Sequence, residues 1–229
     1  MSAPARSAPT LIFDLDGTLV ETAPDLVATL NVVFQSEGLP PVAYKDARTM
    51  IGNGARAMIT HGLNANSRVI TPEKLETLFN DFVAYYTEHV ADHSHPFPGL
   101  IEALDTLSAR GHRFAVCTNK FEKQSRLLLE ALKLTDRFDA ICGQDTFKIA
   151  KPDPEILRRT IAAAGADVSY SIMIGDSETD ILTARAAGIP VIAVDFGYTD
   201  KPIAEYKPDV VISHFSQLPD AVSGISFKR

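Results

Sequence analysis

The stretch that most constrains the fold is residues 11–25, LIFDLDGTLVETAPD. Its first three residues form an apolar run, typical of a parallel strand that is covered on both faces and therefore lacks polar alternation. Asp14 and Asp16 follow where this strand should end, and the period-two alternation of a strand would place them on one side. Ligands of open α/β sheets bind beyond the carboxyl ends of the strands. Two carboxylates repel each other there, so the pair predicts a cation or a shared proton.

The second half of the chain shows a repeating pattern of strands and helices. Short apolar runs alternate with helical patterns of about ten residues from residue 99 onward. The expected strands are residues 114–117, 138–142, 172–174, 191–194 and 210–212, and the expected helices are 100–109, 123–132, 155–164 and 180–187. This alternation is typical of βαβ units. We therefore predict an α/β fold, a doubly wound parallel-sheet (Rossmann-like) core.

Residues 22–90 have a different pattern, which is mostly helical and contains no convincing strand. Apolar side chains recur at helical spacing in residues 23–38. Thr71 and Pro72 then mark the start of another helix, with a hydroxyl as cap and proline in the first turn. We predict an inserted α-helical cap at residues 21–90, and an α/β core made of residues 1–20 and 91–229.

Composition narrows the classes of partner. The formal net charge is -7, and no basic stripe suits a nucleic-acid backbone. No apolar run approaches the ~18 residues of a membrane span, and the first apolar run is cut by Asp14, unlike a secretory signal. Cys117 and Cys142 lie in apolar segments and are expected to be buried free thiols. We predict a cytoplasmic protein without a membrane or nucleic-acid partner; the oligomeric state stays open.

The residues around the acidic pair carry a family resemblance. The segment DLDGTLVETAPDL resembles the first motif of the haloacid-dehalogenase-like hydrolases, and within that superfamily it is most similar to the phosphoglycolate phosphatases. This resemblance implies that Asp14 is a nucleophile that forms an aspartyl-phosphate. It also implies that Asp16 is a general acid/base.

Three further motifs of that family have counterparts at later strand ends. Thr118 and Asn119 follow an apolar strand and offer hydroxyl, amide and backbone donors to a phosphate, as in the second motif. Lys151, in KPDP before a helix, resembles the third motif, whose lysine neutralises nucleophile and phosphate. Asp176 and Asp180 belong to GDSETD, which resembles the fourth motif.

The same resemblance implies a metal cofactor. In the family, Mg²⁺ is bound by the first aspartate, the backbone carbonyl of the second and an aspartate of the fourth motif. By this resemblance the metal ligands are Asp14, Asp16 and Asp176. Asp180 is expected to support these ligands without contacting the metal itself. Mg²⁺ prefers hard oxygen ligands and keeps several waters, so a few protein ligands suffice.

The predicted cap contains one candidate for substrate selection. Residues 51–56, IGNGAR, resemble the cap loop of phosphoglycolate phosphatases. Gly52 and Gly54 would allow close backbone approach, Asn53 adds an amide and Arg56 could add a charge. A helix beginning here would offer unpaired N–H groups to a substrate carboxylate. An ordinary turn between two cap helices is the alternative interpretation.

Together these features favour a Mg²⁺-dependent phosphatase that acts on a small phosphorylated metabolite. The resemblance favours hydrolysis of 2-phosphoglycolate to glycolate and phosphate through an aspartyl-phosphate. The alternatives are a phosphosugar mutase and a phosphatase of another small phosphate, such as a sugar phosphate or pyrophosphate, on the same fold. Mutases of the superfamily resemble DGV(L/I)-x-D-[ST], from which DGTLVET departs. A dehalogenase and a catalytically dead binding module fit the residues less well.

Overall fold

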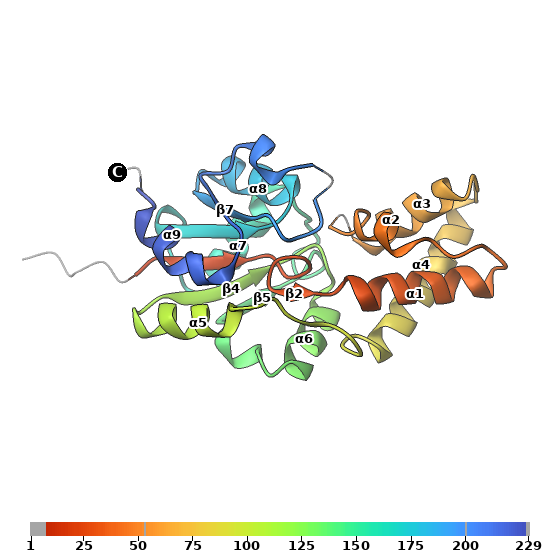
Figure 1. Ribbon diagram of the computed structural model, residues 1–229, viewed down its shortest axis with the longest axis horizontal. Helices are drawn as coiled ribbons and strands as arrows, with labels where there is room; N and C mark the ends of the chain where they lie inside the picture. Colours follow the sequence, from red (N-terminus) through yellow and green to blue (C-terminus); the bar gives the residue numbers. More distant parts are fainter. Residues whose placement is uncertain (1–7, 53, 200, 228–229) are drawn as a thin grey trace, which may run out of the picture.

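A parallel six-stranded sheet forms the centre of the computed structural model, which describes residues 8–52, 54–199 and 201–227 (Figure 1). Every neighbouring pair of strands in this sheet is parallel. In their order across the sheet the strands are β5 (Ala140–Cys142), β4 (Arg113–Cys117), β1 (Thr10–Phe13), β6 (Ser171–Gly175), β7 (Val191–Val194) and β8 (Val210–Ile212). The chain moves outward from β1 in both directions, so the predicted doubly wound α/β fold is confirmed.

Helices cover both faces of the sheet, which explains why its strands are apolar throughout. Successive side chains of β1 enter different cores: Leu11 and Phe13 pack into one hydrophobic cluster, and Ile12 packs into the other. All three side chains are fully buried. The first cluster includes residues of α5 (Leu100–Ala109), α6 (Glu122–Ala131) and α9 (Leu218–Gly224), and the second includes residues of α7 (Pro154–Ala163) and α8 (Glu178–Ala187).

A group of four helices projects beyond the carboxyl ends of the strands (Figure 1). They are α1 (Ala23–Ser36), α2 (Tyr44–Arg48), α3 (Ala55–Ala65) and α4 (Pro72–Glu88), with α4 packed against both α1 and α3. The Thr71 hydroxyl accepts a hydrogen bond from the Lys74 amide, so α4 begins where the sequence predicts. We call these helices the cap; the domain boundaries given above stay a prediction.

The chain enters and leaves the cap at one place. β2 (Val20–Glu21) and β3 (His95–Pro96) pair antiparallel there. Beside this pair, the buried carboxylate of Asp25 accepts hydrogen bonds from the amides of His93 and Ser94 and from the Ser94 hydroxyl, the last at 2.6 Å. The two connections between cap and sheet are therefore tied to each other.

Other details differ from the sequence-based expectation. The strand expected at residues 138–142 begins only at Ala140, because the Phe138 amide bonds to the Thr135 carbonyl and closes a turn. Short 3-10 turns also connect the larger elements: η1 (Thr135–Arg137), η2 (Val168–Tyr170), η3 (Ile203–Tyr206) and η4 (Phe215–Gln217).

The cysteines and the hydropathy of the helices match the composition. Cys117 and Cys142 are buried free thiols, as predicted. In the part of the chain that the structure describes, no helix combines the length and the apolar character needed to cross a bilayer. The cytoplasmic location stays a prediction.

Candidate active site

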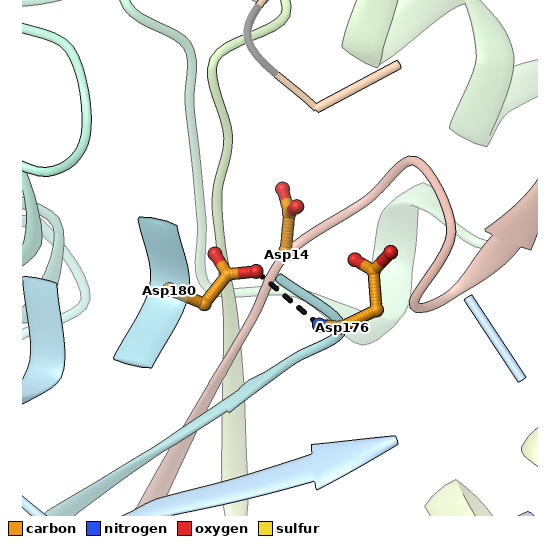
Figure 2. Close-up of side chains that lie close together, drawn as sticks. All are labelled: Asp14, Asp176 and Asp180. Carbon is orange, nitrogen blue, oxygen red and sulfur yellow. Dashed lines mark hydrogen bonds between the residues drawn. The ribbon is translucent and has the colours of Figure 1, made fainter. Parts of the chain in front are cut away.

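Residues from four separate motifs meet at the carboxyl edge of the sheet. Asp14 directly follows β1, Thr118 follows β4 and Asp176 follows β6, while Lys151 lies between β5 and α7. These three strands are neighbours in the sheet, so their ends converge although the residues are far apart in the sequence. All four residues are buried. Figure 2 shows the carboxylates of Asp14, Asp176 and Asp180 gathered at this edge.

The Asp14 carboxylate is held at the end of β1 beside a buried cation. Its backbone amide donates to the Ile174 carbonyl at 2.9 Å, which continues the pairing of β1 with β6. The ammonium of Lys151 lies 2.9 Å from its Oδ1. Burial raises the pKa of Asp14 to about 6, although the nearby Lys151 opposes this shift. The carboxylate is thus held in place, and the Lys151 ammonium partly offsets the electrostatic cost of burying its charge.

Asp180 holds Lys151 from the other side and organises the start of α8. Its Oδ1 lies 2.6 Å from the Lys151 ammonium. Its Oδ2 accepts from the Asp176 amide and from the amide and hydroxyl of Ser177, which completes a capping box (Figure 2). Burial alone would lower the pKa of Lys151, but Asp14 and Asp180 together raise it above its ordinary value, so the lysine stays charged.

The Asp176 carboxylate is oriented by two hydrogen-bond donors and by close packing against the backbone of Gly17. The Thr18 hydroxyl donates to its Oδ1 at 2.9 Å, and the Tyr198 amide donates to its Oδ2 at 2.7 Å. Gly17 lies beside it with φ +81°, and a Cβ there would approach the Asp176 Oδ2 to 2.5 Å. Only glycine fits this turn, because any side chain would both strain the backbone and displace the carboxylate.

The acidic group fits a divalent cation. Asp14, Asp176 and Asp180 each offer a carboxylate oxygen within 4.8 Å of the others. Burial and repulsion from the neighbouring carboxylates raise the pKa of Asp176 to about 8, an electrostatic cost that a cation would relieve. Hard carboxylate ligands suit ions such as Mg²⁺ or Mn²⁺. Asp180 contacts Lys151 through Oδ1 and the start of α8 through Oδ2, and the choice of Asp14 and Asp176 as metal ligands stays a prediction.

The side chain of Asp16 pairs with a residue that the sequence analysis did not select. The Lys120 ammonium lies 2.9 Å and 3.1 Å from its two oxygens. The same ammonium lies 4.4 Å from the ring centre of Tyr86, on cap helix α4. The available signal was position alone, because Lys120 directly follows Thr118 and Asn119 at the end of β4.

Thr118 and Asn119 shape the loop after β4. The Thr118 hydroxyl accepts from the Lys120 amide at 3.2 Å. The Asn119 side chain accepts from the Lys151 amide at 2.8 Å and donates to the Lys151 carbonyl at 3.2 Å, so it clamps the backbone of the lysine. It also reaches the Gly52 carbonyl of the cap at 3.5 Å. Their predicted contacts with substrate stay predictions.

A cleft opens between this edge and the cap. Its floor includes Asp14, Asp16 and Thr118, and its cap wall includes Gly52 and Gly54. The remaining cap residues in the wall are mostly apolar, among them Ile51, Met58, Phe79, Phe82 and Val83. The structure therefore brings two of the selected cap residues to the cleft; Asn53 lies outside the described residues.

Arg56 takes a different position. Its guanidinium pairs with Glu76 at 2.7 Å and lies 3.5 Å from the ring centre of Phe79. Arg56 is not among the described residues that line the cleft. The charge that the sequence analysis expected from Arg56 is thus engaged at the cap surface, where the arginine and Glu76 are both well exposed.

Comparison with known proteins agrees with this geometry. Residues 11–194 match the family of haloacid dehalogenase-like hydrolases. A phosphoglycolate phosphatase of Mesorhizobium japonicum is 47% identical over 212 residues, 93% of each chain. One of Caulobacter vibrioides is 44% identical over 93% of this chain and 90% of its own. The crystal structure of a protein described as a predicted phosphoglycolate phosphatase from Haemophilus somnus superposes with a TM-score of 0.87 at 29% identity, covering 93% of this chain and 97% of that one.

The chain belongs to the haloacid dehalogenase-like hydrolases, which confirms the family predicted from its first motif. Phosphatases of this family generally use a divalent metal, and the acidic group described above is where such a metal would bind.

Proposed function

We propose that this protein is a Mg²⁺-dependent phosphoric monoester hydrolase that converts 2-phosphoglycolate to glycolate and phosphate. The observation that carries the proposal is the buried Asp14 carboxylate, which faces the cleft beside Lys151 and the other acidic ligands. The relatives named phosphoglycolate phosphatase support the substrate, since they match more than nine-tenths of this chain.

Asp14 is the nucleophile. A carboxylate needs no base to attack phosphorus, and attack gives an aspartyl-phosphate on Asp14 as the ester oxygen leaves. Two anions must approach each other in this step, so positive charge at the site lowers the barrier. Lys151 supplies one fixed positive charge at 2.9 Å. When bound by Asp14 and Asp176, with the Asp16 carbonyl, Mg²⁺ would supply the rest of the charge neutralisation at the phosphoryl oxygens.

Asp16 is the general acid and base. It lies two residues beyond the nucleophile and lines the same cleft, so it can reach the leaving oxygen. It gives a proton to that oxygen in the first step and takes one from the attacking water in the second. The loss and the gain of the proton together return Asp16 to its starting state after one turnover.

The cap distinguishes the substrate by its second anionic group. Helix α3 begins at Ala55, and both Gly54 and Ala55 line the cleft. The first turn of a helix has unpaired N–H groups and the positive end of the dipole, which suit a carboxylate. Phosphoglycolate carries a phosphate for the sheet edge and a carboxylate, two carbons away, for this wall.

Phosphate release by the purified protein tests this function. We expect 2-phosphoglycolate to give equal amounts of phosphate and glycolate with Mg²⁺, and no reaction with excess chelator. A hexose phosphate and pyrophosphate serve as comparison substrates. Faster release from either comparison substrate would contradict the proposed substrate, and a phosphoryl group returned to the sugar would indicate a mutase.

A further inference from the structure

The cleft contains a positively charged side chain, that of Lys120, which the proposed mechanism does not use. Lys120 lines the cleft with its side chain only 7% exposed. Burial by itself would lower the pKa of Lys120, but Asp16 and Tyr86 raise it above its ordinary value, so the ammonium stays charged. Lys120 is the one positively charged side chain among the described residues that line this cleft.

The surroundings of Lys120 contain polar atoms without partners. The Tyr86 side chain is 3% exposed, and its hydroxyl makes no hydrogen bond within the described part of the chain. The same holds for the Oε1 of Gln124, whose amide nitrogen donates to the Thr87 hydroxyl at 2.9 Å. Tyr86, Gln124 and Lys120 all line the cleft. Buried polar atoms rarely lack a hydrogen-bond partner, so a polar group of a bound ligand would supply the missing hydrogen bonds at this place.

The position of Lys120 relative to the reacting atoms fits one kind of group. The leaving oxygen of the substrate must come within hydrogen-bond reach of Asp16, and the Lys120 ammonium already lies 2.9 Å from an oxygen of the same carboxylate. A group attached to the carbon next to the ester would therefore arrive beside the ammonium. Apolar side chains of the cap line the same cleft, including Phe82 and Val83, so an anion there loses water and gains strongly from a direct ion pair.

We infer that Lys120, backed by Tyr86, is the residue that selects substrates with a second anionic group close to the phosphate ester. In the free protein its ammonium pairs with Asp16; in the complex it also pairs with the substrate carboxylate, to which the Tyr86 hydroxyl donates. This inference rests on the proposed function, because it assigns the group that recognises the carboxylate of 2-phosphoglycolate. It places the selecting charge on the loop after β4 and not on Arg56.

Two substrates that differ only in the carboxylate test it. Ethyl phosphate and 2-phosphoglycolate have the same two-carbon skeleton and the same kind of leaving oxygen, so an effect through Asp16 changes both equally. We expect Lys120→Met to lower kcat/KM for 2-phosphoglycolate by about 10²-fold more than for ethyl phosphate, the range for loss of a buried charge partner. Tyr86→Phe should lower the same ratio by about tenfold. Lys123→Met, at an exposed lysine on α6, is the matched control.

Binding provides a second readout that does not need turnover. In an Asp14→Asn background, calorimetric titration with Mg²⁺ present should give weaker binding of 2-phosphoglycolate after Lys120→Met and nearly unchanged binding of ethyl phosphate. Lys120→Arg retains the charge and should restore most of the preference. Its recovery would show that loss of the positive charge at this position, and not loss of folding, causes the defect.

The outcomes separate the two proposals. A wild-type protein that prefers 2-phosphoglycolate, while Lys120→Met keeps the whole preference in both readouts, overturns the role of Lys120 alone. A wild-type protein that treats both substrates alike overturns the proposed substrate and this inference together. If neither substrate is hydrolysed, the proposed function fails and the titrations still decide whether Lys120 binds the carboxylate.

Discussion

The two walls of the cleft are built in different ways. At the sheet edge several ionisable side chains have two partners: Lys151 lies between Asp14 and Asp180, and Asp176 receives hydrogen bonds from Thr18 and Tyr198. These contacts join the loops that follow β1, β5, β6 and β7, and the strands themselves are held by the parallel pairing of the sheet. Groups that must stabilise a transition state benefit from this rigidity, because they do not have to reorganise during the reaction.

The cap wall offers fewer fixed polar contacts. Apolar side chains such as Met58 and Phe82 form much of it, together with the backbone around Gly52 and Gly54. The Tyr86 hydroxyl is buried there and has no hydrogen-bond partner among the described residues. The comparison indicates that the sheet edge carries the reaction and the cap wall carries the choice of substrate. Changes to the reacting groups at the edge should therefore affect all substrates, and changes at the cap wall or at Lys120, which lies against Tyr86 of the cap, should affect them unequally.

The largest expected effect comes from Asp14→Asn at the sheet edge. Asparagine retains the shape but lacks the charge that attacks phosphorus, so we expect kcat to fall about 10⁴-fold or more for every substrate. Phosphate release measures this, and circular dichroism checks that the fold is kept. Activity above a trace of wild type would show that another group is the nucleophile.

A smaller loss at the same wall is expected from Asp16→Asn. The usual contribution of a general acid/base predicts a loss of about 10²–10⁴-fold for alkyl phosphates. A nitrophenyl leaving group needs less protonation, so its first step should suffer less. Rapid-mixing measurement of that step for both leaving groups tests the assignment; equal losses would contradict the acid role.

Metal binding at the edge should depend on pH. The pKa of Asp176 is raised to about 8 in the metal-free fold, above its ordinary 3.8, so the folded protein holds a proton there that the unfolded chain has lost. Between these values the free energy of unfolding of the metal-free protein should fall as pH rises. Because metal displaces this proton, Mg²⁺ affinity should increase about tenfold per unit between pH 6 and 8. Calorimetry at three pH values checks this, and an affinity that does not vary with pH would contradict it.

The smallest change is expected at the cap wall, from Gly54→Val. A side chain there points toward the Asn119 carbonyl and Gln144, across the path of a carboxylate at the start of α3. We expect kcat/KM to fall about tenfold more for 2-phosphoglycolate than for an uncharged aryl phosphate, which is the size of one lost hydrogen bond to a charged group. Equal losses would mean that this loop only shapes the cap.

Backbone strain needs its own control in that experiment. Gly54 has φ +85°, so valine is strained there whatever the space around it. Gly38, also within the cap region, has φ +65° and nothing within 4 Å of an added Cβ. Gly38→Val thus reproduces the strain away from the cleft, and its effect on both substrates should be equal.

The sheet and its motif residues could be predicted because their signals are local. The side chains of β1 are buried on both faces, so the strand is apolar throughout, and the acids that follow it mark its end. Lys151 and Asp176 likewise stand next to a recognisable helix or strand. Parallel pairing then brings such ends together without any further information from the sequence.

The contacts that the sequence did not reveal depend on packing between distant segments. The pairing of Lys120 with Asp16 joins two loops that no periodic pattern connects. The Tyr198 hydroxyl accepts from the amides of Thr22 and Ala23 at the start of α1, while its own amide holds Asp176. A tyrosine in a loop carries no local sign of either contact. The two-residue strands β2 and β3 are equally too short for a propensity signal.

The antiparallel junction of β2 and β3 also affects how the chain can fold. Bringing Glu21 and His95 together through a flexible chain of that length would cost roughly 4 kcal/mol of loop-closure entropy. A cap that has already folded brings its own ends close, and the hydrogen bonds of Asp25 with His93 and Ser94 keep them there. Once the cap has folded, β1 and β4 are in effect joined by a short connection, which lowers the entropy cost of pairing them. A helical insert of another length, closed by the same junction, would leave the register of the sheet unchanged, so the cap can diverge in sequence and size while the pairing of the strands stays constant.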